Sequence, residues 1–374
     1  MVKKTQKEEV KVEEVKTETG LDPEILAIIS ALGKKYDDKN LVMPLGKKGG
    51  YVKDANLIST GSLCVDRAIG VISKNDKGEI VTGIPRGRIV EIFGEPGSGK
   101  STLISHMMKS CQNAGSIAGV IDVEQVYDKF YAEKIGVDTD KLFFCQPSYA
   151  EQALDVLDSL VRSGKFGILC LDSVAALVTQ KELEGQMGDA QMGGIARLMS
   201  QAMRKINGFV NKTGTIAVFT NQIRKNLVGY GNPNTTTGGE ALKFFSSIRM
   251  ELSRVGYLKD SSGDTIGIRV KMKTVKNKIS APFAVCEFDI LFGYGIDTYG
   301  EVVDIATDYG IINKKGAWFS YGEQMVGQGR QNTVLALKDN NELYNLIKAE
   351  VLEKMYLESS GSVCESEAEN EKEG

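Results

Sequence analysis

The sequence has one histidine, and its cysteines form no CxxC pair. The single histidine, His106, has no second copy with which to build a redundant Ser/His/Asp or Cys/His arrangement, so we interpret it as structural. The cysteines are far apart in the chain, at Cys64, Cys111, Cys145, Cys170, Cys286 and Cys364. This spacing favours reduced thiols that act as small apolar residues over disulfides or a zinc site.

Long hydrophobic runs are also missing. The longest, such as ILCL at 168–171, is far below the roughly 18 residues expected of a membrane span. The charged start MVKKTQKEEVK has no apolar segment of a signal peptide. We therefore expect a cytoplasmic protein with no membrane partner, and 374 residues suffice for one large core and a smaller second one.

Charge is distributed unevenly along the chain. The net charge is −3, but residues 358–374 hold six glutamates and one lysine and so carry −5, which leaves +2 for residues 1–357. Such a tail is typical of solvated disorder, although a minority of acidic tails mimic nucleic acid and compete for a basic surface. The first twenty residues balance five lysines against five glutamates and are also expected to be disordered.

The central region alternates apolar strand-like segments with helical ones. Asp22 as N-cap and Pro23 predict an earlier helix with its apolar stripe on Ile25, Ile28, Ile29 and Leu32. The predicted strands are RIVEIF (88–93), SIAGVID (116–122), KLFFC (141–145), GILCLD (167–172), TIAVFTN (215–221), IRMEL (248–252), IRVKMKTV (268–275) and AVCEFDILF (284–292). Short apolar strands separated by helices indicate a largely parallel sheet covered on both faces. A helix is predicted over 193–211, and helical stretches near 302–309 and 341–355 predict a small α-rich lid.

A phosphate-binding loop follows the first of these strands. In GEPGSGKST, Gly94, Gly99, Lys100 and Ser101 have P-loop spacing, and a helix-compatible segment comes next. Backbone N–H groups of such a loop point at phosphates, the lysine reaches the β and γ phosphates, and the serine ligates magnesium. The expected contacts are Gly94, Glu95, Pro96, Gly97, Ser98, Gly99, Lys100, Ser101 and Thr102.

Two carboxylates follow buried strands. Asp172 ends GILCLD in the form of a Walker B aspartate, so we expect it to share the metal with Ser101. Glu124 follows SIAGVID, and we interpret it as the catalytic base that activates water. Without further support, an exposed loop glutamate would be the ordinary interpretation of Glu124.

Residues 222–239, QIRKNLVGYGNPNTTTGG, show neither helical nor alternating apolar periodicity. Loops of this length in compact domains usually bind something or are disordered. A side-chain amide at the strand end, Gln222, can hydrogen-bond the γ-phosphate, and the loop that begins there can rearrange when that bond is lost.

The chain resembles the RecA family of homologous-recombination ATPases from about Ile25 to Met355. The most specific blocks are STGS (59–62), LVRSGKFG followed by LDSVAAL, MSQAMRKI, NQIR with GNPNTTTGGEALKF, VKNKISAPF, and GAWFSYG with GQGR. The resemblance implies an α/β fold with a RecA-type P-loop core, a mostly parallel twisted sheet flanked by helices, an N-terminal helix/strand arm and a small C-terminal α/β domain. It also implies an ATP- and Mg²⁺-dependent recombinase that forms helical filaments on single-stranded DNA, hydrolyses ATP in response to DNA, and carries out pairing and strand exchange in repair.

By this resemblance, Gln222 senses the γ-phosphate and Lys276 and Lys278 reach the ATP of a neighbouring copy. Asp128 and Tyr131 are implied to contact adenine from one side, and Phe292 and Gly293 from the other. The implied DNA contacts are Met192, Arg197 and Arg204 in and after the first DNA loop; Arg224, Leu227, Thr235, Thr237, Gly238, Gly239 and Glu240 in the second; and Lys314, Lys315, Trp318 and Arg330 in a lid that admits duplex DNA. Partners implied beyond DNA are a single-strand binding protein, loader proteins and a damage-response repressor.

The resemblance implies a division into a charged tail (1–20), an oligomerisation arm (21–57), the ATPase core (58–296), the lid (297–357) and the acidic tail (358–374).

Several departures from the family pattern indicate a divergent member, bacterial or phage-encoded. The P-loop interior is EPGS where the family usually has proline, glutamate and two serines, Gln125 replaces a usual histidine, and the second loop is one residue shorter with Lys225 at an apolar position. The segment 70–87 is longer than usual. Two alternatives stay open: a hexameric helicase of the same core, and a nucleotide-gated DNA-binding scaffold without catalysis.

Overall fold

The computed structural model describes residues 22–37, 42, 56–186, 193–225 and 234–360. The chain separates into two compact units, Met1–Lys53 and Asp54–Gly374. Within the first unit, helix α1 (Pro23–Lys35) starts at Asp22, whose Oδ1 accepts a hydrogen bond from the Glu24 N–H at 2.8 Å. This confirms the predicted cap, and Ile25 and Ile28 on the predicted apolar stripe are exposed.

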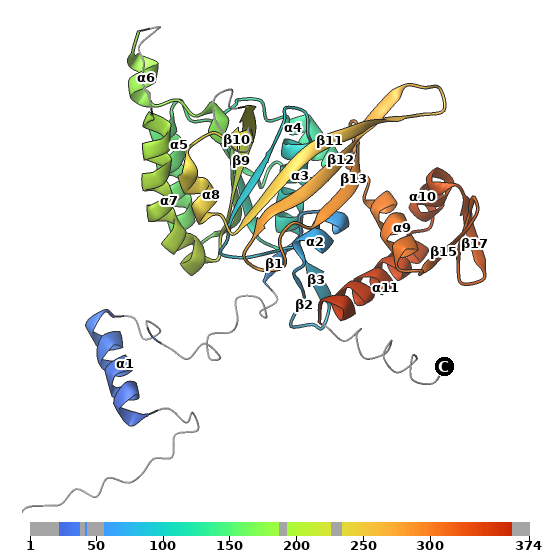
Figure 1. Ribbon diagram of the computed structural model, residues 1–374, viewed down its shortest axis with the longest axis horizontal. Helices are drawn as coiled ribbons and strands as arrows, with labels where there is room; N and C mark the ends of the chain where they lie inside the picture. The colour runs from blue at the N-terminus through green and yellow to red at the C-terminus, as the bar shows by residue number, and fades with distance from the viewer. Residues whose placement is uncertain (1–21, 38–41, 43–55, 187–192, 226–233, 361–374) are drawn as a thin grey trace, which may run out of the picture. The chain divides into compact units, whose positions relative to one another are not determined.

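The second unit is built on a large mixed sheet (Figure 1). The strand order is β14-β13-β12-β11-β5-β9-β8-β6-β7, with β10 paired to β9. The bounds are β5 (Ile89–Gly94), β6 (Ile117–Asp122), β7 (Phe143–Cys145), β8 (Phe166–Asp172), β9 (Ile216–Lys225), β10 (Asn234–Thr236), β11 (Ile248–Lys259), β12 (Thr265–Asn277), β13 (Val285–Leu291) and β14 (Gly295–Ile296). Strands β11, β5, β9, β8, β6 and β7 are mutually parallel, which confirms the predicted parallel sheet.

Alternation along the central strands divides the core into two layers. In β8, Ile168 and Cys170 pack with the cluster under α2 and α3, whereas Leu169 and Leu171 pack with the cluster under α5 and α7. Figure 1 shows these helices on opposite faces of the sheet. The core helices are α2 (Leu63–Ile69), α3 (Lys100–Asn113), α4 (Lys129–Ile135), α5 (Ala150–Arg162), α6 (Gln180–Glu184), α7 (Gly194–Thr213) and α8 (Glu240–Phe245), with a 3₁₀ turn at Val174–Ala176. Both faces of each central strand are therefore buried, as a near-continuous apolar strand requires.

The segment 222–239 contains more regular structure than the sequence predicted. Strand β9 continues through Lys225, and β10 pairs with it antiparallel from Asn234 to Thr236. The prediction of a loop was therefore wrong for residues 222–225 and 234–236, because antiparallel pairing satisfies backbone groups that the apolar period did not reveal. Strands β11 and β12 also run well past their apolar centres as a long antiparallel pair.

The C-terminal part has its own core. It comprises α9 (Thr298–Asp308), β15 (Ile312–Lys315), β16 (Trp318–Tyr321), β17 (Gln324–Gln328), α10 (Arg330–Asp339) and α11 (Asn341–Ser359). Val303, Phe319, Leu337 and Ile347 are among its buried residues. The lid is therefore the small α/β domain that the family resemblance implied. The α-rich lid expected from helical periods was wrong, since the short antiparallel sheet has too little apolar alternation to be recognised from the sequence.

The connection over 70–87 folds as β2 (Ile72–Lys74), β3 (Ile80–Thr82) and β4 (Ile84–Pro85), and β4 pairs with β1 (Leu57–Ile58). The Lys74 ammonium lies 4.8 Å from the centroid of the Tyr356 ring on α11. The extra residues thus form a hairpin against the last helix. Among the described helices, none has both the length and the apolar character needed to cross a membrane.

Candidate nucleotide and DNA site

The P-loop begins at the carboxyl end of β5, in the middle of the sheet. A Cβ on Gly94 would lie 2.1 Å from the backbone oxygen of Leu252, so only glycine fits there. Gly99 has φ +89° and caps α3. The Ser98 hydroxyl oxygen is buried and has no hydrogen-bond partner among the described residues. A loop with glycine-only backbone positions and a free buried hydroxyl at a helix N-terminus fits a phosphate group.

Lys100, Ser101 and Asp172 converge beside this loop. The Lys100 Nζ donates to the carbonyls of Gly94 and Glu95 at 3.1 and 2.9 Å. Burial lowers the pKa of Lys100, opposed by the charges of Asp172 and Glu124. Ser101 Oγ donates to Asp172 Oδ2 at 3.1 Å. The predicted metal ligands, Ser101 and Asp172, are therefore adjacent, and the hydroxyl and carboxylate oxygens match the ligands that Mg²⁺ takes.

Asp172 is held by a second hydroxyl. Thr220 Oγ1, on the adjacent strand β9, donates to Asp172 Oδ1. Burial raises the pKa of Asp172, the Thr220 hydrogen bond opposes this, and the nearby Glu124 charge adds to the rise. A bound cation would favour the charged carboxylate at this position.

Glu124 and Gln222 meet at the same edge of the sheet. Gln222 is the register partner of Gly94 in the β5–β9 pair, and its Nε2 donates to Glu124 Oε1 at 3.1 Å. The Ser173 hydroxyl donates to the same Glu124 oxygen. The residues predicted as catalytic base and γ-phosphate sensor are thus brought together beside the P-loop.

The structure brings only some of the residues predicted to contact adenine close together. The Tyr131 hydroxyl lies 3.1 Å from Thr102 Oγ1, close to the start of α3. Asp128 caps α4 by accepting from the Tyr131 N–H at 3.0 Å. Phe292 is exposed and, with Gly293, follows β13, whose Ile290 side chain lies against Gly99. No ring pair or hydrogen bond joins Phe292 to Tyr131 within the described parts of the chain.

Lys276 and Lys278 lie away from the P-loop of their own chain. Lys276 pairs in register with Arg249, which pairs with Glu91, three residues before Gly94. Its Nζ donates to the carbonyls of Lys243 and Phe244 at 2.6 and 2.9 Å, at the end of α8. Burial, with the charges of Lys278 and Arg249, lowers the pKa of Lys276 to about 8. The Lys278 ammonium lies 5.8 Å from the Phe244 ring centroid.

The predicted DNA residues fall into three groups. Arg197 and Arg204 are exposed on α7. Gly238 and Gly239 have φ of +89° and +77° and approach Val174 and Ala196, and Glu240 opens α8. The predictions for Met192 and Leu227, and for the side chains of Arg224 and Thr235, lie outside the described residues.

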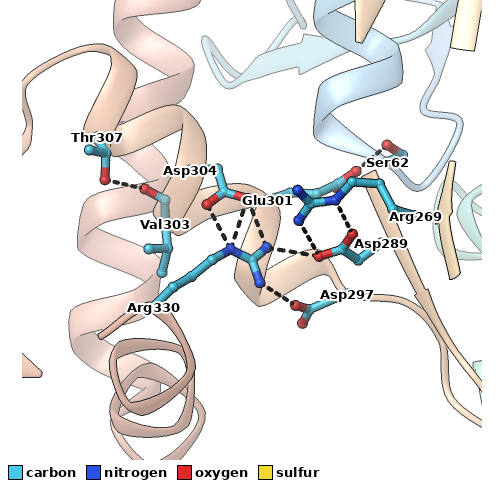
Figure 2. Close-up of polar contacts among 9 residues, drawn as sticks. All are labelled: Ser62, Arg269, Asp289, Asp297, Glu301, Val303, Asp304, Thr307 and Arg330. Carbon is cyan, nitrogen blue, oxygen red and sulfur yellow. Dashed lines mark hydrogen bonds and ion pairs between the residues drawn. The ribbon is translucent and has the colours of Figure 1, made fainter. Parts of the chain in front are cut away.

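The residues predicted on the lid differ in environment, and Figure 2 shows the carboxylates around one of them, Arg330. Lys314, Lys315 and Trp318 are exposed. Arg330 forms ion pairs with Asp304 at 2.8 Å, Asp289 at 3.4 Å and Asp297 at 3.7 Å. Its charge is thus balanced by carboxylates from β13, the β14–α9 junction and α9, which gives this arginine a role in joining the lid to the core.

Comparison with known proteins agrees with this geometry. The family model described as the RecA N-terminal domain matches residues 24–297, and that of the RecA C-terminal domain matches residues 300–356. This chain belongs to the RecA family. "Protein RecA" of Cytophaga hutchinsonii is 46% identical over 346 residues, covering 92% of this chain and 94% of that protein. "Protein RecA" of Rubrobacter xylanophilus is 48% identical over 301 residues, covering 80% of this chain and 84% of that protein.

Among solved structures, the "Crystal structure of the RadB recombinase" aligns with 64% of this chain and 98% of its own, with a TM-score of 0.48 and 15% identity. The family assignment does not depend on this weak likeness. As a RecA family member, the chain is an ATP-dependent recombinase of DNA recombination and repair, with the RecA-type α/β fold, DNA-dependent ATPase activity and a nucleotide-binding site.

Sequence reasoning missed four polar residues next to the site: Ser173, Thr220, Asn221 and Glu91. Glu91 carried a usable signal, because a charge inside the apolar strand RIVEIF must find a partner when it is buried. The three others follow or end apolar strands, where a polar side chain is equally consistent with simple solvent exposure. His106 was correctly interpreted as structural, since its Nε2 accepts from the Ile296 N–H at 2.9 Å and burial lowers its pKa to about 4.

Proposed function

We propose that this chain binds ATP with Mg²⁺ at the P-loop, assembles into a helical filament on single-stranded DNA, and promotes homologous pairing and strand exchange under the control of its nucleotide. The observation that carries the proposal is the position of Gln222. It lies opposite Gly94 and bonds Glu124, and its own strand continues into the pair with β10 that borders the second DNA loop. One strand thus joins the hydrolytic site to the DNA-binding segment.

In this proposal Glu124 accepts a proton from the attacking water, and Lys100 stabilises the transferred phosphoryl group. Ser101 and Asp172 would hold the metal, which supplies charge neutralisation at the β and γ phosphates when bound. Tyr131 and Asp128 would lie beside the purine, with Phe292 and Gly293 contributing from the end of β13. Ordinary acid–base catalysis by a positioned carboxylate accelerates such a step by about 10²–10⁴-fold.

Lys276 and Lys278 would act on the nucleotide of a neighbouring copy. Their contacts with the end of α8 direct them away from the P-loop of their own chain. A filament, in which each copy offers different surfaces to its two neighbours, places one such surface against the next P-loop. The exposed apolar stripe of α1 gives the arm at 21–57 a surface to bury in such an assembly.

DNA would be held by Arg197, Arg204 and the glycine- and threonine-rich second loop, through contacts with phosphates that do not identify bases. The core at 58–296, the lid at 297–357 with Lys314, Lys315 and Trp318 facing duplex DNA, and the two charged tails complete the proposed division. A single-strand binding protein, loader proteins and a damage-response repressor are the further partners that we propose.

Phosphate release measured with and without single-stranded DNA tests this function. Turnover should rise several-fold with DNA and be lost in Lys100→Ala. Imaging of the same mixture with an ATP analogue that is not hydrolysed should show open filaments. Unchanged turnover in the presence of DNA, or closed rings in the images, would contradict the proposal.

A further inference from the structure

Glu91 is a fully buried carboxylate in the central strand β5. Its neighbours Ile89 and Phe93 are on the same face of the strand, and Ile89 belongs to the cluster packed against α5 and α7. A buried carboxylate is strongly unfavourable unless it is paired and hydrogen-bonded. Both of its oxygens have partners: Arg249 Nε lies 2.5 Å from Oε2, and Asn221 Nδ2 lies 3.0 Å from Oε1.

Asn221 uses the same amide group for a second bond. Its Nδ2 donates to the backbone carbonyl of Thr237 at 2.8 Å. The β9–β10 ladder ends at the pair Ile223 and Thr236, so this carbonyl is the first one beyond the ladder. Asn221 Oδ1 also accepts from the Gln222 N–H at 2.9 Å. One buried side chain therefore connects the Gln222 backbone, the buried carboxylate and the base of the second loop.

Lys276, the lysine that we propose acts on the nucleotide of a neighbouring copy, lies next to this network. Glu91, Arg249 and Lys276 form a row across β5, β11 and β12 in direct register. Lys276 in turn holds the end of α8, whose start follows Thr237 by three residues. The segment before α8 is thus tied to Glu91 through Asn221, and the end of α8 is tied to Lys276, which is joined to Arg249 through the pairing of their strands.

We propose that Asn221 is a positioning residue that transmits the state of Gln222 to the second DNA loop, by holding the Thr237 carbonyl against the buried Glu91–Arg249 pair. This inference rests on the proposed function, because it names the connection through which the nucleotide controls the grip on DNA. When Gln222 moves, the Gln222 backbone changes its bond to Asn221, and the Thr237 carbonyl moves with the amide that holds it. The network can carry this change because Glu91 and Asn221 are fully buried and are hydrogen-bonded to each other, so that a shift of one moves the other.

The test measures the coupling between the two ligands. Single-stranded DNA affinity is determined with ADP and with an ATP analogue that is not hydrolysed, for the full chain and for Asn221→Ala. The wild-type protein should bind DNA more tightly with the analogue. In Asn221→Ala the ratio of the two affinities should fall at least about tenfold, which corresponds to about 1.4 kcal/mol of coupling. Affinity for the analogue without DNA should change by less than about threefold, as expected when the nucleotide contacts are separate.

A matched control is available at the other end of the same strand. Thr215 is buried, and its hydroxyl donates to the Phe166 carbonyl at 2.9 Å. Thr215→Ala removes a buried hydrogen bond of similar type but should keep the wild-type affinity ratio. If Thr215→Ala reduces the ratio as much as Asn221→Ala does, the effect is a loss of general stability and the inference is wrong.

A double variant, Glu91→Gln with Asn221→Asp, separates the bond between residues 91 and 221 from the bond to the Thr237 carbonyl. It replaces Asn221→Ala in the test if that variant does not fold. It rebuilds an amide-to-carboxylate bond at this point but leaves the Thr237 carbonyl without its amide donor. The ratio should stay low in this pair, and recovery to the wild-type value would overturn the inference. A wild-type protein without nucleotide-dependent DNA affinity would instead overturn the proposed function and this inference with it.

Discussion

Gln222 Nε2 donates a hydrogen bond to Glu124 Oε1 at 3.1 Å. The groups predicted as γ-phosphate sensor and catalytic base therefore contact each other directly, and Ser173 donates to the same oxygen. A γ-phosphate that takes the amide of Gln222 would release one bond on Glu124 and leave it oriented by Ser173. The sensor can thus act on the base as well as on the DNA loop.

Replacing Glu124 by glutamine should lower DNA-stimulated ATP turnover by about 10²–10⁴-fold, because the amide cannot accept the proton of the attacking water. Glutamine keeps the shape of the side chain and its contacts, so nucleotide binding should persist. Phosphate release and equilibrium binding of a fluorescent nucleotide measure the two effects. Glu133→Gln, on the exposed surface of α4, is the matched control and should leave turnover unchanged. Turnover above a tenth of the wild-type value in Glu124→Gln would remove Glu124 from this role.

The sequence was sufficient for the parts of the fold that repeat a simple pattern. The continuous apolar runs in GILCLD and TIAVFTN predicted strands that are buried on both faces, and the P-loop spacing predicted that Lys100 and Ser101 follow the strand RIVEIF. It did not show that Arg330 would be neutralised, because its carboxylate partners Asp289, Asp297 and Asp304 become neighbours only when the lid packs on the core. The Asn221 connection was hidden for the same reason, since it depends on register between strands that are far apart in the chain.

Arg330→Ala should weaken the junction between lid and core. The substitution leaves three carboxylates close together without the guanidinium that bridges them, and Arg269 can compensate only at Asp289, which it contacts at 2.8 Å (Figure 2). Since Arg330 is partly exposed, we expect a loss of about 1–3 kcal/mol in the free energy of unfolding. Chemical denaturation measures it. Arg330→Lys should also be destabilised, because an ammonium cannot replace the planar fork that contacts Asp304 through two nitrogens.

The exposed Lys314 is the control for this junction. Lys314→Ala should leave the free energy of unfolding within about 0.5 kcal/mol of the wild-type value. Duplex binding at several salt concentrations then separates the two roles of Arg330. A variant Arg330→Ala with unchanged stability and a reduced salt slope would mean that Arg330 contacts DNA phosphates and that the junction does not depend on it.

Glu301 should make stability depend on pH. It is buried on α9, where its oxygens accept from the Ser62 hydroxyl and, at 2.9 Å, from the Leu63 N–H. Burial raises its pKa to about 8, the hydrogen bonds oppose this, and the charges of Asp66 and Asp297 add to the rise. The folded chain then binds a proton more strongly than the unfolded chain between the usual pKa of 4.5 and about 8. This stronger proton binding stabilises the folded state. The stabilisation is fully present below pH 4.5 and is lost as the pH rises through about 8.

Glu301→Gln copies the uncharged form and should remove that dependence. Above pH 8 the variant should be more stable than the wild-type protein by roughly 1 kcal/mol or more, and near pH 5 the two should be close. Thermal unfolding across this range provides the comparison, with Glu353→Gln on the exposed side of α11 as control. Parallel curves for Glu301→Gln and the wild-type protein would show that Glu301 stays charged in the folded state.

Mixing two inactive variants tests whether Lys276 and Lys278 serve a neighbour. Glu124→Gln lacks the base but keeps both lysines, and the double variant Lys276→Ala, Lys278→Ala keeps the base but lacks the lysines. In a random filament about a quarter of the junctions combine an intact base with intact lysines from the adjacent copy, so the mixture should regain up to about a quarter of wild-type turnover. Phosphate release with single-stranded DNA measures this. The control is a mixture of the double variant with a triple variant that carries Glu124→Gln, Lys276→Ala and Lys278→Ala. This mixture has no intact lysines and should stay inactive. If the first mixture is as inactive as its components, the lysines act within their own chain or not at all.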